Sequence, residues 1–150
     1  AVSSALEALQ RGAHIVTDTN MALSGINKRS LHGLGCEAYC FMSDADVAEE
    51  ARVRGVTRAM VSMEKACWLD GDLIFAVGNA PRALIQLDEL IRAGKLLPKL
   101  IIGVPVGFVN VVQSKELILS LTDTPYIVAQ GRKGGSNIAA CICNALLYML

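Results

Sequence analysis

The chain has 150 residues, of which 53% are hydrophobic and 19% are charged, with 14 basic residues and 14 acidic ones. This length predicts a single domain, and the apolar fraction fits a packed core and argues against intrinsic disorder. The balanced charge argues against a protein that coats nucleic acid or an acidic membrane surface, because both tasks need an excess of Lys and Arg. A neutral chain this apolar also disfavours a lone monomer.

Membrane and secretion signals are weak in this sequence. The longest apolar stretch, residues 100–112, contains Gly and Pro and is shorter than the roughly 18–20 residues of a spanning helix. The first residues lack the basic and apolar blocks of a signal peptide. The five Cys include the pairs Cys36 and Cys40 and Cys141 and Cys143, and neither pair has CxxC spacing. We therefore expect a cytoplasmic protein with buried free thiols, with a metal site as the alternative.

Helix and strand patterns alternate in the first half of the chain. Ser4 and Glu7 form a capping box that predicts an opening helix, ended by Gly12. Then come a strand at 13–16, a brief helix at 21–23, a strand at 37–42, and helices at 44–55 and 57–68 capped by Asp44 and Thr57. Residues 27–35 between them, which include His32, are predicted to be a flexible stretch.

The second half shows the same alternation. A strand is predicted at 72–77, and the strongest helix pattern in the chain runs from Asn79 and Pro81 to Gly94. Next come a strand at 100–106, a helix at 114–121, a strand at 126–130, and a final helix from about residue 137. The final helix is apolar nearly all round, which predicts that it is buried, packed on another subunit, or both.

This order of elements predicts the fold class. Strands that are apolar along their whole length and separated by helices indicate a three-layer α/β domain, in which helices cover both faces of a mostly parallel sheet. We expect residues 1–150 to form this one domain. Ligands of such sheets bind outside the carboxyl ends of the strands. The segments to inspect there are residues 17–18, 42–44, 78–81, 103–110 and 131–136.

The segment GRKGGS at 131–136 is the most suggestive of these. Its glycines allow the backbone to turn with exposed amides, the next helix offers free N–H groups, and Arg132 and Lys133 add two positive charges. Together these groups can hold carboxylates or phosphates. The segment matches neither the Walker pattern nor GxGxxG. The alternative is an ordinary glycine-rich turn with two solvated cations.

Four further features carry both a functional and a structural interpretation. The helix start at Asn79 and Pro81 can bind an acidic group or be a plain cap. Gly-rich residues 103–110 can lie against a flat ligand or form a tight crossover. Asp18 can accept a hydrogen bond from a ligand or cap the next helix, and Arg58 can reach a carboxylate or be a first-turn residue.

The two histidines give no catalytic signal by themselves. His14 lies in a predicted strand and is expected to be a satisfied core residue, and His32 is expected to be exposed. No Ser/His/Asp set and no metal cluster emerges from the sequence. The residues alone therefore predict a binder of a polyanionic or planar small molecule.

The order of five segments resembles one known family. These are VTDTNMALSGI, TRAMVSM, AVGNAPRALIQLDELI, LIIGVPVGFVNVVQSKE and GRKGGSNIAACICNALLYM. The chain is similar over essentially its whole length to the precorrin-8X (cobalt-precorrin-8) methylmutases. The resemblance implies an isomerase of cobalamin biosynthesis that moves a methyl group between adjacent carbons of a corrin-type ring and gives hydrogenobyrinic or cobyrinic acid. It implies no redox cofactor, no metal bound by the protein, and a homodimer with the tetrapyrrole pocket near its interface.

The resemblance also implies a role for each candidate site residue. The substrate is a broad apolar ring edged with carboxylates, so the small backbone at 103–108 suits the ring face. The helix starts and nearby cations suit the carboxylate rim: Asn79, Pro81, Gly134, Ser136, Arg58, Arg132 and Lys133. The backbone at Phe41, Met42 and Ser43 is expected to border the pocket.

One departure from the family concerns catalysis. The family's catalytic histidine, which protonates the ring, belongs to a segment upstream of Ala1, and neither His14 nor His32 falls at its position. We therefore expect no catalytic residue in this chain, which resembles the carboxyl-terminal three-quarters of a methylmutase. Two alternatives stay open: a corrinoid-binding paralogue without turnover, and an unrelated α/β domain that binds a phosphorylated ligand.

Overall fold

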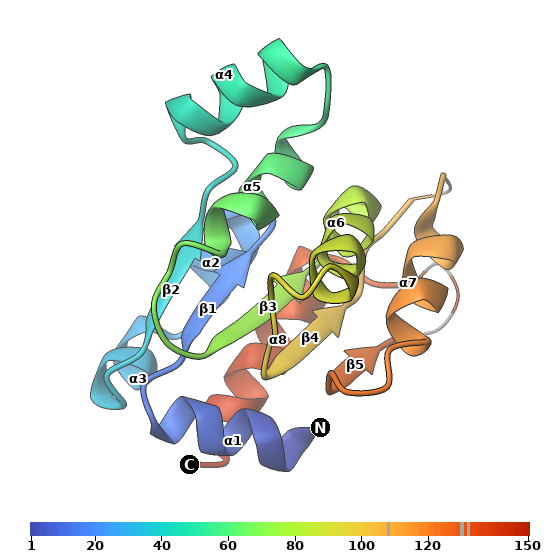
Figure 1. Cartoon of the computed structure of the whole chain (residues 1–150). Coiled ribbons are helices and arrows are strands. Elements are labelled where there is room, and N and C mark those ends of the chain that lie inside the picture. The colour runs from blue at the N-terminus through green and yellow to red at the C-terminus, as the bar shows by residue number, and fades with distance from the viewer. Residues whose placement is uncertain (108, 130, 132) are drawn as a thin grey trace.

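The computed structural model describes residues 1–107, 109–129, 131 and 133–150, and its centre is one five-stranded sheet (Figure 1). The strands are β1 (His14–Thr17), β2 (Glu37–Cys40), β3 (Leu73–Val77), β4 (Leu100–Gly103) and β5 (Tyr126–Val128). Their order across the sheet is β2-β1-β3-β4-β5, and every neighbouring pair is parallel. The predicted parallel sheet is confirmed.

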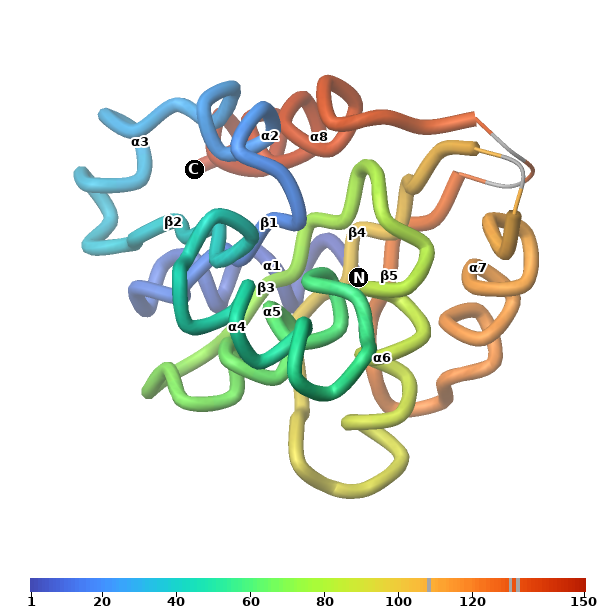
Figure 2. The backbone as a smooth tube through the Cα atoms, turned by 90° about the horizontal axis from the view of Figure 1, so that it is seen from above, coloured from blue at the N-terminus to red at the C-terminus, as the bar shows by residue number. Residues whose placement is uncertain are grey.

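Helices cover both faces of this sheet, as predicted for a three-layer fold. One face carries α1 (Val2–Gln10), α2 (Asn20–Gly25), α3 (Lys28–Gly33) and α8 (Ser136–Tyr148). The other carries α5 (Arg58–Ala66), α6 (Pro81–Arg92) and α7 (Val111–Leu119), while α4 (Ala45–Arg54) packs on α5 and projects from the body. Figure 2 shows α2, α3 and α8 on the side of the sheet opposite α5 and α6. None of the described helices is long and apolar enough to cross a membrane.

Two apolar cores follow from the alternation of side chains along the strands. The core under α1, α2, α3 and α8 takes Ile15, Ile74, Ala76, Leu100 and Ile102 from the sheet. The core under α5, α6 and α7 takes Val16, Leu73, Phe75, Val77 and Ile101. Because successive strand residues point to opposite faces, a sheet covered on both sides needs strands that are apolar throughout. This physical demand explains why the strand pattern was visible in the sequence.

The predicted capping box of the first helix is wrong. Helix α1 begins at Val2, so Ser4 lies inside it, and the Ser4 hydroxyl donates a hydrogen bond to the carbonyl of Lys99 at 3.1 Å. Ser4 therefore ties α1 to the residue just before β4. A serine near the start of a helix can cap the helix or bind a distant carbonyl, and the available partner in the fold decides between the two.

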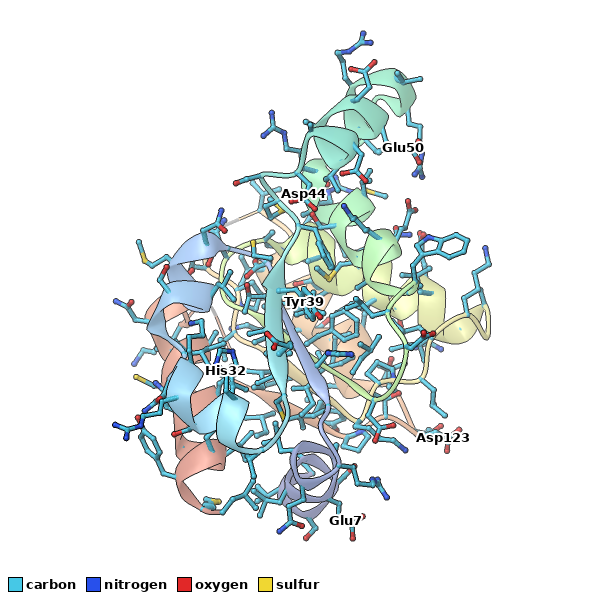
Figure 3. The ribbon with its side chains drawn as sticks, turned by 90° about the vertical axis from the view of Figure 1, so that its left-hand side faces the viewer. Glu7, His32, Tyr39, Asp44, Glu50 and Asp123 are labelled. Carbon is cyan, nitrogen blue, oxygen red and sulfur yellow. The ribbon has the colours of Figure 1, made fainter. Side chains whose placement is uncertain are left out.

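The predicted flexible stretch at 27–35 contains the helix α3. Asn27 caps this helix by accepting a hydrogen bond from the Ser30 N–H at 3.0 Å. This cap is a local signal that the apolar pattern of the segment did not reveal. His32 lies on α3 and is exposed as predicted, with its Nε2 3.6 Å from a carboxylate oxygen of Glu37 (Figure 3). The strands predicted at 37–42 and 100–106 end earlier, at Cys40 and Gly103.

Two smaller predictions are also corrected. Cys141 is exposed, whereas Cys36 and Cys143 are buried as expected; all five cysteines are free. Asp44 occupies the cap position of α4, but its carboxylate contacts the Lys65 ammonium at 2.7 Å and caps no backbone amide. Helix α8, which is apolar nearly all round, buries only one face within this chain, and packing of its other face on a second subunit stays a prediction.

Candidate functional site

An open groove of about 620 Å³ lies at the carboxyl end of the sheet, in the size range of small-molecule sites. The strand order is β2-β1-β3-β4-β5, so β2 is added on one side of β1 and β3 on the other. Ligands of such sheets bind outside the point between β1 and β3 where the strand order switches. The groove is lined by Thr19, Met21, Gly78, Asn79, Val106, Gly134, Gly135, Ser136, Asn137 and Ile138. Four segments that are distant in sequence therefore meet there.

Asp18 fills the position that a ligand anion would take at the start of α6. Its carboxylate accepts hydrogen bonds from the backbone N–H groups of Gly78 at 2.9 Å, Asn79 at 2.9 Å and Ala80 at 2.6 Å. The residue is only 1% exposed, and burial raises its pKa while the three amides oppose the rise. Asp18 is therefore neither a ligand acceptor nor a cap of the next helix.

This contact corrects the expected role of the helix start at Asn79 and Pro81. The cap position of α6 is Ala80, and Pro81, the first helical residue, has no N–H to donate. Since Asp18 already occupies the amides of residues 78–80, these are not free for a carboxylate in this structure. Asn79 still lines the groove, whereas Pro81 does not.

Two hydroxyl groups join the walls of the groove. Thr19 caps α2 by accepting a hydrogen bond from the Ala22 N–H at 3.0 Å, as a residue with extended backbone before a helix does. Its Oγ1 lies 2.8 Å from Oγ of Ser136, the first residue of α8. This pair fixes the starts of α2 and α8 against each other and leaves both hydroxyls at the groove surface.

The glycines of the groove allow three backbone segments to touch. The Gly135 N–H donates to the carbonyl of Val104 at 2.8 Å. A Cβ at Gly134 would lie 2.0 Å from that carbonyl oxygen, and a Cβ at Gly78 would lie 2.7 Å from the carbonyl oxygen of Gly135. No side chain fits at either position. At these two positions the backbone of another segment is what comes close.

Sequence reasoning missed Lys115, which holds the loop before α8. This residue of α7 is 2% exposed, and its ammonium donates to the carbonyl oxygens of Gly131 at 2.9 Å and Lys133 at 2.8 Å. Burial lowers its pKa. A lysine within a helix is normally solvated, and its partners here are backbone carbonyls, so the sequence contains no pattern that could have indicated it.

The other predicted site residues divide into those near the groove and those away from it. Gly134 and Ser136 line the groove, and Lys133, immediately before them, is exposed. Arg58 lies at the exposed start of α5 and lines a separate hollow with residues of α4, so the structure does not bring it to the groove. Arg132 lies outside the described residues, as does position 108 of the predicted ring-facing segment.

Residues 41–43 do not line the groove. Phe41 is buried, stacks on Tyr39 with a ring-centroid distance of 5.7 Å, and lies under the Lys65 ammonium. The sulfur of Met42 accepts a hydrogen bond from the Ser62 hydroxyl at 3.2 Å. The hydroxyl of Ser43 accepts one at 2.8 Å from the side-chain amide of Asn20, the first residue of α2.

Neither histidine lies among the groove residues of the described chain. His14 was expected to be satisfied, but its Nδ1 is buried and has no hydrogen-bond partner among the described residues. Its ring instead packs edge-on against Tyr39 at 5.3 Å. Within the described residues no group of three His, Cys, Asp or Glu side chains could hold a metal ion.

Comparison with known proteins gives a consistent answer. The family described as "Precorrin-8X methylmutase" matches residues 1–149. The "Cobalt-precorrin-8 methylmutase" of Leptospira interrogans is 47% identical over 156 residues, covering 99% of this chain and 71% of that protein; the Salmonella typhimurium protein of the same name is 44% identical, covering 100% and 70%. The crystal structure of the Thermus thermophilus precorrin-8X methylmutase superposes with a TM-score of 0.87 at 38% identity, covering 99% of this chain and 72% of that one. The chain belongs to the precorrin-8X methylmutase family.

Proposed function

We propose that this chain provides the substrate-binding groove of a precorrin-8X or cobalt-precorrin-8 methylmutase, an isomerase of cobalamin biosynthesis. The reaction moves a methyl group from one carbon of the corrin-type ring to its neighbour, giving hydrogenobyrinic or cobyrinic acid. One carbon–methyl bond breaks and one forms in the same molecule, so no second substrate is consumed. The proposal includes the cytoplasm as the place of action.

The groove at the carboxyl ends of β1 and β3 is the observation that carries this proposal. Its apolar side chains suit a ring face, since Met21 is 65% exposed and Ile138 41% exposed. The start of α8 presents the positive end of its helix dipole at Gly134 to Ser136, beside the cation of Lys133. An apolar surface with a positive rim fits a flat macrocycle edged with carboxylates.

The direct test is an absorbance titration of hydrogenobyrinic acid with the wild-type protein and with Arg132→Ala/Lys133→Ala. We expect the double variant to bind at least about tenfold more weakly, because charge-assisted contacts of 1.5–3 kcal/mol are lost. Lys95→Ala, which removes an exposed cation beyond the end of α6, is the matched control. Unchanged affinity in the double variant would contradict the proposal.

Turnover is a separate measurement. Methyl migration is followed by the change in the absorbance spectrum when the tetrapyrrole substrate is supplied. Binding together with migration supports the methylmutase, and binding without migration supports a corrinoid-binding protein. Nucleotide binding with indifference to tetrapyrroles would instead support a phospholigand domain.

We further propose that the protein acts as a homodimer. The end of α8 exposes Tyr148 (64%) and Met149 (60%), large apolar side chains that a monomer leaves in water. Light scattering coupled to size-exclusion chromatography tests this proposal with the wild type and Tyr148→Ser/Met149→Ser. We expect a dimer mass for the wild type and a shift toward monomer for the variant, and a wild-type monomer at micromolar concentration would refute the proposal.

A further inference from the structure

Lys115 is a charged residue that is buried, and its burial needs an explanation. Moving an ammonium out of water is strongly unfavourable unless it is paired or hydrogen-bonded. Among the described residues no carboxylate lies within the 4.0 Å that defines an ion pair with Lys115. Its hydrogen-bond partners are the backbone carbonyls of Gly131 and Lys133, both exposed loop residues. We infer that the buried charge serves to fix these two carbonyls.

The hydrogen bonds from Lys115 hold one end of the loop, and Val104, the residue after β4, holds the other. Helix α7 is rigidly packed, because Val111, Ser114 and Ile118 are buried together with Lys115. The Gly135 N–H is bound to the carbonyl of Val104. The loop before α8 is therefore fixed at residues 131, 133 and 135, although it is glycine-rich and would otherwise be free to move.

Fixing the Lys133 carbonyl also sets the direction of the next amide. In a planar trans peptide the N–H points opposite to the C=O of the same unit. Because the Lys133 carbonyl points to the Lys115 ammonium, the Gly134 N–H points away from Lys115. Gly134 lines the groove, so its amide is a donor with a preset direction next to the exposed Lys133 side chain.

We propose that Lys115 is a positioning residue for carboxylate binding: its ammonium holds the loop so that the Gly134 amide and Lys133 meet a carboxylate of the ligand. The inference rests on the proposed function for the identity of the ligand, but not for the anchoring of the loop. Lys115 touches no substrate in this account and acts only through the residues that it fixes.

Lys115→Met is the informative substitution. Methionine keeps an unbranched apolar stem and removes the charge and the donors. The released carbonyls belong to exposed residues that water can reach, so we expect the fold to persist, which circular dichroism checks. Lys115→Arg restores a cation and donors, and Lys95→Met removes one positive charge from an exposed position beyond α6.

The binding experiment compares hydrogenobyrinic acid with its fully methyl-esterified derivative, which has the same ring and no carboxylates. For Lys115→Met we expect affinity for the acid to fall about tenfold and affinity for the ester to change less than about twofold. Lys115→Arg should recover part of the loss, and Lys95→Met should match the wild type. Equal losses for acid and ester would show a merely structural role, and an unchanged affinity for the acid would likewise overturn the proposal.

Limited trypsin digestion tests the anchoring of the loop without any ligand. Cleavage after Lys133 requires local opening, and we expect it to be about tenfold faster in Lys115→Met than in the wild type or Lys95→Met. An unchanged rate would overturn the anchoring. If the wild type binds neither corrinoid, the proposed function fails, while the digestion still decides whether Lys115 holds the loop.

Discussion

Replacing Asp18 tests the internal support of the groove, because this one carboxylate satisfies three backbone amides. In Asp18→Asn the single amide oxygen can still serve the N–H groups of Asn79 and Ala80, but the new NH₂ then faces the Gly78 N–H, donor against donor. A hydrogen bond to a charged group contributes about 1.5–3 kcal/mol, and removal of a buried charge offsets part of its loss. We expect unfolding to become easier by about 2 kcal/mol.

Asp18→Ala should cost more, about 4 kcal/mol, since it leaves all three amides without their partner. For a chain of 150 residues, a loss of about 2 kcal/mol corresponds to a fall in Tm of roughly 4–8 °C. Urea denaturation followed by circular dichroism measures both variants against the wild type. If Asp18→Asn were as stable as the wild type or more so, a neutral side chain would satisfy the three amides as well as the carboxylate does, and the reasoning would be refuted.

The same residue predicts a pH dependence. Burial raises the pKa of Asp18 in the folded protein above the ordinary 3.8 that it has in the unfolded chain. In the pH range between these two pKa values the folded state binds more protons, so the contribution of Asp18 to the free energy of unfolding falls as pH rises. The stability margin over Asp18→Asn should therefore widen on acidification from pH 7 toward 4, and a narrowing margin would contradict this. Gly134→Ala should lower Tm by several degrees, because the new Cβ would collide with the Val104 carbonyl. Gly33→Ala should leave Tm unchanged, because Gly33 has open space around it. Equal Tm values for the two variants would contradict the close contact between Gly134 and Val104. Iodoacetamide should label exposed Cys141 first and Cys143 last, since burial raises the pKa of Cys143 to about 12. Mass spectrometry of timed digests reads the order, and early labelling of Cys143 would contradict the burial.

The sheet and most helices could be predicted because their signals are local and redundant. Strand β3 is apolar at every position, as burial on both faces demands, and α6 combines Pro81 at its first turn with a stripe of apolar residues. Thr57 accepts a hydrogen bond from the Met60 N–H and so caps α5 as predicted. Each of these features depends on residues close together in the chain.

The predictions that failed concern residues whose partners are distant in the sequence. Asp18 and Gly78 are sixty positions apart, and nothing near either residue shows that a carboxylate already occupies the start of α6. The Lys115 contact joins a helix to backbone carbonyls, which have no sequence signal at all. The glycine-rich loop was correctly placed at the carboxyl end of the sheet, because the fold class alone fixes that position.

The main proposal is that the groove at the carboxyl ends of β1 and β3 binds the tetrapyrrole. Protein labelled with ¹⁵N only at glycine reports on this claim directly, by amide spectra recorded during a titration with hydrogenobyrinic acid. We predict that the signals of Gly78, Gly134 and Gly135, which line the groove, shift with added ligand, while Gly55 at the end of α4 and Gly94 after α6 do not. Shifts confined to the distant glycines, or no shifts at saturating ligand, would contradict the claim.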